Sequence, residues 1–402
     1  AYEMQRSLVG SEMCIRDRHS RINQEQMERF NMTPRSDYRE KIEALGFDFH
    51  GDYWREEAYY RFTPAEIERL EEATREAYRM YCEAAEYIIS EKPDFMERML
   101  QIPAEVCERI CESWNRDELS LYGRFDFLLD EKGVPRILEF NADTPTSLLE
   151  ASVIQWQWKE ECFPECDQYN GIHEGLVQSW KDIFPAGSNI HFVGALDDHE
   201  DTGTLQYLAS TAMEAGYSTR VLDINSMNLQ NGLFYDPSGE CIQKCFKLYP
   251  WEWMIDESPD GCLAQVEWLE PIWKLVMSNK AILSILYELF PDSPYVLPCY
   301  LSRPQQGVFC KKPVFSREGH NVSVVDIRQW EEHALLKETE GDYNTGAYVY
   351  QEYVKPVAYS GRYPVIGSWI VGGEPAGIGI RENRTEITDN LSEFVPHIIS
   401  CL

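Results

Sequence analysis

Four polar residues alternate along two neighbouring segments whose composition predicts β-strands. Arg124 and Asp126 are two apart in the first segment, and Glu139 and Asn141 are two apart in the second. Because side chains alternate across a strand, each pair shares one face. The turn-forming residues 130–133 (DEKG) predict a hairpin that brings the two pairs together.

This predicted hairpin has the chemistry of a magnesium site. Asp126, Glu139 and Asn141 supply hard oxygen ligands, which Mg²⁺ prefers, usually with waters and substrate phosphates. Arg124 would then face a transferred phosphate group. The alternative is a surface hairpin held by salt bridges.

A run of small polar residues, 142–147 (ADTPTS), follows the hairpin and precedes a helical pattern. Thr146 or Ser147 is expected to cap that helix. The same hydroxyls at a helix N-terminus would also suit a substrate carboxylate or phosphate. Both interpretations stay open at this point.

Several residues nearer the C-terminus are candidates for nucleotide binding. Lys312 precedes the polar loop 316–321, whose backbone N–H groups can bind phosphates while Arg317 contacts the transferred group. Lys280 is a second candidate for the phosphates, and Gln351, on a predicted strand, is a candidate for an adenine edge. The loop is not a Walker A sequence, and the alternatives are a charged hairpin and a solvated surface lysine.

Periodicity indicates a mixed α/β (α+β) fold. The region from about 23 to 110 is mostly helical in pattern, and Thr63-Pro64 predicts the start of a long amphipathic helix. Strand 189–196, helix 202–215 and strand 218–224 follow one another, which is typical of a parallel α/β unit.

Composition excludes some classes of function. The 402 residues carry a net charge of −31, which argues against nucleic-acid binding because phosphate contacts need a basic face. An acidic surface would attract a polyamine, although the charge taken alone is better explained by plain solubility. No apolar run reaches the roughly 18 residues of a membrane helix, and no CxxC pair supports a zinc or redox motif.

The segment 1–19 fits no pattern that leads into the rest of the chain. Its stretch QRSLVGSEMCIRDR resembles the translation of a sequencing adapter. We therefore treat it as non-native, and we expect the folded unit to occupy 20–402.

At this point the motifs together resemble the synthetase domain of the glutathionylspermidine synthase family. The order of the blocks matches over roughly 21–397. The blocks are YGRFDF (122–127), LEFNADTPTSL (138–148), FKLYPWEWM (246–254), SNK (278–280), KP with SREG (312–319), GSWI (367–370), GIRE (379–382) and FVPH (394–397).

The resemblance implies a circularly permuted ATP-grasp fold with a pre-ATP-grasp α/β unit. It places a helical region at about 20–118, the metal-binding hairpin at about 119–150, the α/β unit at about 189–225 and an ATP-binding lid at about 281–350. It implies an ADP-forming, cytoplasmic C–N ligase that uses ATP and Mg²⁺. Such an enzyme joins glutathione, or a similar peptide, to spermidine or another polyamine through an acyl-phosphate.

The resemblance also assigns roles by position. The expected metal ligands are Asp126, Glu139 and Asn141, the catalytic cations Arg124 and Arg317, the ATP contacts Lys280, Lys312 and Gln351, and the substrate contacts Thr146, Ser147, Glu200, Asp201 and Arg381. Glu200 and Asp201 would hold the polyamine, although acids at a helix N-terminus also stabilise the helix dipole.

Two departures from the family pattern affect these expectations. The phosphate loop has Gly319-His320 where two glycines are usual, and no room remains for an amidase domain, so hydrolysis of the conjugate is not expected. One rival is the same chemistry on another peptide or amino acid. The other is a binding protein for ATP or polyamines without turnover. A homodimer remains one option for the assembly.

Overall fold

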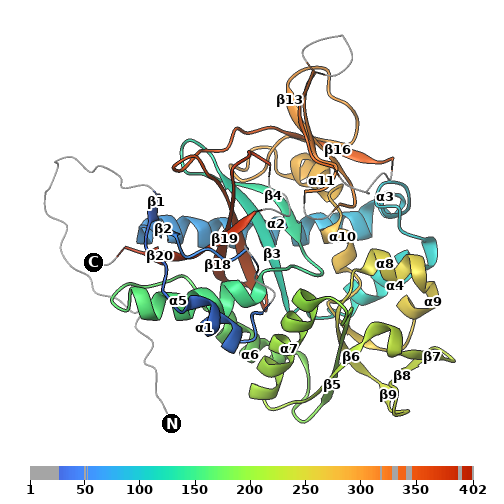
Figure 1. Cartoon of the computed structure of the whole chain (residues 1–402). Coiled ribbons are helices and arrows are strands. Elements are labelled where there is room, and N and C mark those ends of the chain that lie inside the picture. The colour runs from blue at the N-terminus through green and yellow to red at the C-terminus, as the bar shows by residue number, and fades with distance from the viewer. Residues whose placement is uncertain are drawn as a thin grey trace, which may run out of the picture.

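The computed structural model describes residues 27–48, 51, 53–316, 319–327, 334–340, 346–387 and 392–400 (Figure 1). The segment 1–19 and Arg317 lie outside these described residues. In the described part, no helix is long and apolar enough to cross a membrane.

A five-stranded antiparallel sheet lies at the centre, in the order β19-β18-β17-β3-β4. Its strands are β3 (Tyr122–Leu129), β4 (Pro135–Asn141), β17 (Tyr363–Val371), β18 (Glu374–Asn383) and β19 (Glu393–Val395). The predicted β3–β4 hairpin is confirmed. The Asp130 carboxylate closes the turn by accepting the backbone N–H groups of Lys132 and Val134 at 2.8 and 2.9 Å.

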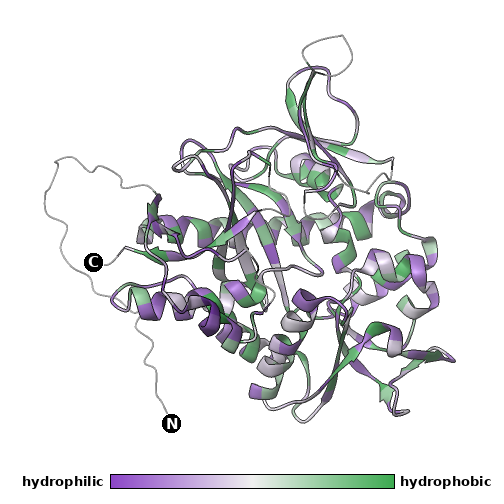
Figure 2. Cartoon of the chain, viewed as in Figure 1, coloured by the Kyte–Doolittle hydropathy of each residue, from purple (hydrophilic) through white to green (hydrophobic). Residues whose placement is uncertain are grey.

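The long helix α2 (Pro64–Glu91) packs on one face of this sheet. Thr63 is the N-cap, as predicted, and together with Glu66 it forms a reciprocal cap at the start of the helix. Tyr81 packs edge-on against Phe125 and Phe140, with ring centroids 5.3 and 5.2 Å apart. Because neighbouring residues point to opposite faces, Arg124 and Asp126 project away from α2. Figure 2 shows purple and green alternating along α2, as expected for a helix with one buried face.

The other face of the sheet is covered by η1 (Glu150–Ile154) and α6 (Ile172–Ile183), with α5 (Gln155–Cys162) between them in sequence. Trp369 and Tyr122 stack on this side with centroids 6.0 Å apart. The central sheet is therefore enclosed by helices on both faces, and Arg124 and Asp126 lie on the η1 side.

The N-terminal region is mostly helical, as predicted, with α1 (Tyr38–Ala44), α3 (Pro93–Arg98) and α4 (Ala104–Asn115) beside α2. However, it also contains β1 (Glu28–Asn31) and β2 (Ala58–Phe62), which the helical expectation missed. β2 pairs in parallel with β20 (His397–Ile399) near the other end of the chain. β2 is the middle strand of the sheet β1-β2-β20, so it is stabilised by pairing with two other segments, one of them more than 300 residues away, rather than by local periodicity.

The predicted parallel α/β unit is confirmed. Its sheet has the order β11-β10-β5-β6, with β5 (Asn189–Gly194), β6 (Ser218–Asp223), β10 (Lys244–Leu248) and β11 (Glu267–Leu269). Helix α7 (His199–Glu214) connects β5 to β6 and is followed by Gly216 at φ 101°. The short elements η2 (Ile224–Ser226), β7 (Asn228–Gln230), β8 (Leu233–Tyr235), β9 (Cys241–Ile242), α8 (Trp251–Glu257) and α9 (Pro259–Cys262) complete this unit.

A second five-stranded sheet, here called the upper sheet, extends above the hairpin in Figure 1. Its order is β12-β16-β13-β14-β15, with β12 (Cys299–Tyr300), β13 (Val308–Pro313), β14 (Ser323–Asp326), β15 (Ala334–Glu338) and β16 (Tyr348–Glu352). Helices α10 (Lys274–Ser278) and α11 (Ile282–Leu289) lead into it.

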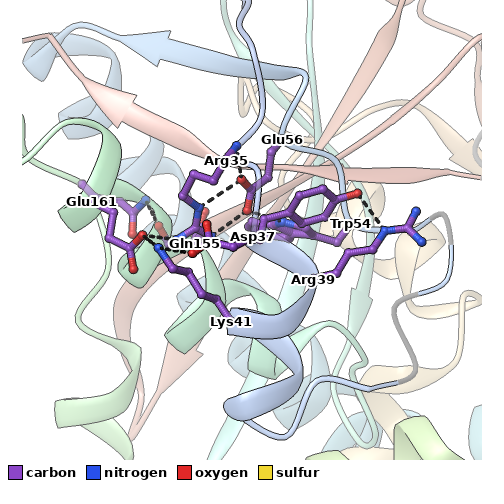
Figure 3. Close-up of polar contacts among 10 residues, drawn as sticks. Arg35, Asp37, Arg39, Lys41, Trp54, Glu56, Gln155 and Glu161 are labelled. Carbon is purple, nitrogen blue, oxygen red and sulfur yellow. Dashed lines mark hydrogen bonds and ion pairs between the residues drawn. The ribbon is translucent and has the colours of Figure 1, made fainter.

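A buried ion pair fixes the N-terminal segment to the body of the protein (Figure 3). The Glu56 carboxylate is fully buried and accepts hydrogen bonds from Arg35 Nη2 at 2.6 Å and from Trp54 Nε1 at 3.0 Å. Arg35 Nη1 also lies 2.9 Å from Glu161 on α5. The segment before α1 is thereby tied to the helix that follows η1.

We expect Glu56→Ala to lower the free energy of unfolding by about 3 kcal/mol, because it leaves the Arg35 guanidinium without its buried carboxylate. Urea denaturation followed by circular dichroism measures this change. The control is Glu71→Ala, which removes an exposed partner of Arg75 and should cost about 0.5 kcal/mol or less. Equal losses in the two variants would contradict the structural role of Glu56.

Candidate functional site

One large cavity, of about 470 Å³, lies where the β3–β4 hairpin, the upper sheet and the end of β18 meet. Eleven of the thirteen residues predicted for the site line it: Arg124, Asp126, Glu139, Asn141, Thr146, Ser147, Glu200, Lys280, Lys312, Gln351 and Arg381. Asp201 does not line this cavity, and Arg317 is outside the described residues.

The hairpin places its acids opposite one another. Asp126 on β3 pairs directly with Glu139 on β4, Arg124 pairs with Asn141, and the register shifts by one residue immediately after Asp126. Such irregularities re-aim side chains and are common beside active sites. Two carboxylates and one carboxamide therefore share one wall of the cavity.

Asp126 is held by two arginines from different strands. Arg124 donates to it from Nε at 2.7 Å and from Nη2 at 3.2 Å. Arg381, on β18, donates to its Oδ2 at 2.6 Å. Burial of Arg124 alone would lower the pKa of its guanidinium, but the Asp126 carboxylate outweighs burial and raises that pKa.

Glu139 lies among lysines. Lys280 Nζ is 3.0 Å from its Oε2 and also donates to the Ser316 carbonyl at 2.6 Å. Burial would raise the pKa of Glu139, but the ammonium groups of Lys280 and Lys312 lower it to about 2. Glu139 is therefore ionised throughout the neutral range and can bind a cation without first losing a proton.

The side chain of Gln351 orients Lys312. Lys312 Nζ donates to Gln351 Oε1 at 2.8 Å and to the Leu138 carbonyl at 3.2 Å, while Gln351 Nε2 donates to the Ile137 carbonyl at 2.9 Å. Both ends of the carboxamide are therefore engaged with the protein. In this arrangement Gln351 orients Lys312, in addition to lining the cavity.

Neither Thr146 nor Ser147 caps the following helix. Ser147 has a left-handed backbone, with φ 67°, and its hydroxyl lies 2.5 Å from the Tyr53 hydroxyl. The Thr146 carbonyl accepts a hydrogen bond from Arg124 Nη1 at 2.5 Å. Non-glycine residues in this conformation are often found at ligand sites, so the substrate-binding interpretation fits better than capping.

The acids at the start of α7 have different positions. Asp198 caps this helix by accepting the backbone N–H groups of Glu200 and Asp201 at 2.8 and 3.1 Å. Glu200 lines the cavity near Ser147 and Tyr53, whereas Asp201 is not among its lining residues. The structure therefore brings only one of the two predicted polyamine ligands into the cavity.

The oxygen ligands of the hairpin fit a magnesium ion. Mg²⁺ commonly takes one or two carboxylates and completes its shell with waters and substrate phosphates. Asp126, Glu139 and the Asn141 carboxamide match that ligand set. Within the described ranges, no group of three His, Cys, Asp or Glu side chains is placed to hold a metal by itself, which is consistent with a shell that a substrate must complete.

Two features of the site were not predicted from the sequence. Glu150, on η1, is 1% exposed, and its Oε1 has no hydrogen-bond partner in the described part of the chain. Burial and the nearby Glu200 carboxylate raise the pKa of Glu150 to about 8. Glu386, in the loop after β18, accepts hydrogen bonds from Lys337 and Tyr353 and so connects the upper sheet to the strand that carries Arg381. No local pattern indicates either role.

Several known proteins are similar to this chain in sequence. A protein of Haemophilus influenzae named "Putative acid–amine ligase" is 35% identical over 384 residues, which cover 90% of this chain and 97% of that protein. The trypanothione synthetase of Crithidia fasciculata is 29% identical over 352 residues, covering 78% of this chain and 52% of that protein. The bifunctional glutathionylspermidine synthetase/amidase of Escherichia coli is 25% identical over 376 residues, covering 85% and 59%. This chain thus spans a little over half the length of the last two proteins.

The fold is also shared with a solved structure. A glutathione synthetase-like effector from Globodera pallida superposes with a TM-score of 0.55 at 9% identity, covering 92% of this chain and all of that one. The sequence model described as "Glutathionylspermidine synthase preATP-grasp" matches residues 29–400. With a match over nearly the whole described chain and a relative that is 35% identical over its length, the protein belongs to the glutathionylspermidine synthase pre-ATP-grasp family.

Proposed function

We propose that this protein is an ADP-forming carboxylate–amine ligase that uses ATP and Mg²⁺ to join a glutathione-like peptide to a polyamine. The observation that carries the proposal is the wall of Asp126, Glu139 and Asn141 facing four cationic side chains in one cavity. These cations are Arg124, Arg381, Lys280 and Lys312. The names of the relatives, all ligases or synthetases, support this reaction class.

In this reaction the substrate carboxylate oxygen attacks the γ-phosphorus of ATP, and the bond from that phosphorus to the β–γ bridging oxygen breaks to release ADP. The amine nitrogen then attacks the carbonyl carbon of the acyl-phosphate, and the C–O bond to phosphate breaks. A bound Mg²⁺ would neutralise the phosphate oxygens and lower the barrier to transfer.

The residues of the chain supply positioning and charge. Lys280 and Lys312 are placed to bind the phosphates of ATP, and Arg124 is placed to stabilise the group in transfer. Arg381 and the hydroxyls of Thr146 and Ser147 are placed for the acceptor carboxylate. The assignment of these residues, the ATP-grasp lid at about 281–350, its circular permutation and a cytoplasmic location are parts of this proposal.

The decisive experiment measures ADP release against a matrix of small peptides and polyamines, with the amide product identified by mass spectrometry. Release of ADP that requires both an acid and an amine supports the ligase. The same activity with other peptides or amino acids would keep the chemistry and change the substrate. ATP or polyamine binding without turnover would favour a binding protein.

Two single substitutions test which of the neighbouring acids Glu200 and Asp201 binds the amine substrate. We expect Glu200→Ala to raise the Michaelis constant for spermidine about tenfold, because it removes a carboxylate from the cavity wall. Asp201→Ala should change it less than twofold, because Asp201 does not line the cavity. Initial rates of ADP release at varied spermidine, with ATP saturating, measure both.

Salt provides a further check on Glu200. Added salt screens the attraction between a carboxylate and a polyamine. Raising the salt concentration should therefore raise the Michaelis constant for spermidine more in the wild type than in Glu200→Ala. If Glu200→Ala uses spermidine as well as the wild type does, the amine binds elsewhere.

A further inference from the structure

Tyr53 enters the main cavity from a segment that is remote in sequence from the other lining residues. The backbone of this segment pairs with Phe394 on β19. The Tyr53 carbonyl accepts the Phe394 N–H at 2.8 Å, and the Arg55 N–H donates to the Phe394 carbonyl at 3.0 Å. The Tyr53 ring also packs edge-on against the Phe394 ring, with centroids 6.2 Å apart. Both the backbone and the ring of Tyr53 are therefore held by the protein itself.

The Tyr53 hydroxyl lies 2.5 Å from the hydroxyl of Ser147, a buried residue with a fixed backbone. The Ser147 carbonyl accepts the Ala151 N–H at 3.2 Å, and the carbonyl of the preceding residue, Thr146, accepts a hydrogen bond from Arg124 at 2.5 Å. The left-handed backbone of Ser147, with φ 67°, is one that serine rarely adopts. Two hydroxyl groups on firmly held supports therefore meet at the cavity wall.

This pair of hydroxyls has one proton more than it uses. Each hydroxyl has one proton to donate and two lone pairs that accept. The hydrogen bond between Tyr53 and Ser147 uses one of the two protons, whichever residue donates. Among the described residues, the two hydroxyls are hydrogen-bonded only to each other. The pair therefore offers the cavity one further O–H donor.

The Tyr53 hydroxyl keeps its proton in the neutral range. Burial and the Glu150 carboxylate raise the pKa of Tyr53 further above its usual value, and Arg381 offsets only part of this effect. The Glu200 carboxylate acts in the same direction as Glu150, but in the described part of the chain neither acid accepts a hydrogen bond from Tyr53. The pair is therefore suited to donate a hydrogen bond and not to remove a proton.

The chemistry of the two proposed substrates decides what this donor binds. A protonated polyamine has no lone pair to accept a hydrogen bond, and the lone pair of the attacking amine is used in the attack. An oxygen of the acid substrate accepts, and the guanidinium groups of Arg124 and Arg381 on the same cavity wall favour a negatively charged oxygen. The charges of Glu150 and Glu200 instead suit the cationic amine that must come beside the acid.

We propose that Tyr53 is a positioning residue for the acid substrate, because it fixes the Ser147 hydroxyl so that the pair donates one hydrogen bond to the carboxylate oxygen that does not attack ATP. The inference rests on the proposed ligase function and adds a residue from the N-terminal segment to it. The bound oxygen becomes the carbonyl oxygen of the acyl-phosphate.

The same oxygen gains negative charge when the amine nitrogen forms its bond to the carbonyl carbon and gives one proton to water. The charge returns to the carbonyl bond as the C–O bond to phosphate breaks. A hydrogen bond to this oxygen is therefore strongest while the charge is present, so that it contributes to turnover as well as to binding.

Tyr53→Phe, Ser147→Ala and the double variant test the proposal in the full chain, with initial rates of ADP release at varied glutathione, Mg-ATP and spermidine. We expect Tyr53→Phe to raise the Michaelis constant for glutathione about tenfold through the loss of one hydrogen bond. The Michaelis constant for ATP should change less than twofold, because phenylalanine keeps the ring that packs against Phe394. The double variant should lose no more than Ser147→Ala alone, because either substitution already breaks the pair.

The matched control is Tyr59→Phe, which removes the hydroxyl of a nearby tyrosine on β2 that does not line the cavity, and it should behave as the wild type. Equal increases in the Michaelis constants for ATP and glutathione in Tyr53→Phe would overturn the proposal. A loss in the double variant close to the product of the two single losses would do the same. If Ser147→Ala does not fold, Ser147→Gly replaces it, since glycine accepts the positive φ.

The pH dependence of turnover provides a second readout. Because the hydroxyl pair keeps its protons, Tyr53→Phe should show the wild-type pH profile at a lower rate. A profile displaced along the pH axis would mean that Tyr53 removes a proton, and the positioning role would be wrong.

Failure of the ligase function is distinguishable from failure of this inference. If another acid supports ADP release, that acid replaces glutathione in the assays. If no acid does, calorimetric titration with glutathione, in the presence of Mg²⁺ and a non-hydrolysable ATP analogue, compares the wild type with Tyr53→Phe. Weaker glutathione binding by Tyr53→Phe, with unchanged binding of the ATP analogue, supports the role of Tyr53. Equal binding by the two proteins, or none by the wild type, overturns it.

Discussion

Glu139→Gln is expected to reduce ADP release by about 10² to 10³-fold, because it removes a full negative charge from the proposed magnesium site and keeps the shape of the side chain. Its melting temperature should change little, since Glu139 borders the cavity and Lys280 keeps its bond to the Ser316 carbonyl. Magnesium titrations of activity and thermal unfolding of the same samples measure the two effects separately.

The control is Glu131→Gln, in the exposed turn of the same hairpin, which should behave as the wild type. Near-wild-type ADP release by Glu139→Gln at saturating magnesium would reject the metal assignment. Asp126→Asn should also abolish turnover, but we expect it to unfold more readily. Its carboxylate is bound by Arg124 and Arg381, and removing that charge leaves two cations without their shared partner.

Arg124→Lys is expected to lower kcat by about 10²-fold while changing the Michaelis constant for ATP by less than threefold. Lysine keeps the positive charge, but it cannot reproduce the fork that holds Asp126 through two nitrogens and reaches the Thr146 carbonyl with a third. A cation that acts mainly on the group in transfer affects turnover more than ground-state binding.

Arg136→Lys is a suitable control, since Arg136 lies on the same hairpin and pairs with Asp130 outside the cavity. Initial rates over a range of ATP concentrations give both constants. A loss confined to the Michaelis constant would make Arg124 a ground-state ATP contact. Full activity would place the stabilising cation elsewhere, with Arg317 as the next candidate.

The hairpin was predictable from the sequence because residues close together along the chain specify it. Alternation places Arg124 with Asp126 and Glu139 with Asn141, and the turn at 130–133 requires that the two strands pair. The same holds for α2, whose start is indicated by Thr63 and Pro64, and for the parallel α/β unit. In each case neighbouring residues along the chain specify the element.

Other features depend on contacts between distant segments, and no local pattern reveals them. Arg381 reaches Asp126 from a strand 255 residues later. Strand β2 pairs on one side with β20, more than 300 residues later in the chain. Glu200 and Asp201 are adjacent in sequence and alike in chemistry, yet only the first lines the cavity. The family resemblance supplied the candidate residues, but their partners and burial required the assembled structure.

The long separation between the strands of the central sheet has a consequence for the synthesis of the protein on the ribosome. The central sheet takes β3 and β4 from residues 122–141 and β17, β18 and β19 from residues 363–395, so it cannot form before the later strands have been made. Folding that depends on such distant pairings is slow, because the chain loses the entropy of closing a long loop before it gains the stabilising contacts. A nascent chain that has not yet reached β18 therefore cannot bring Asp126 together with Arg381.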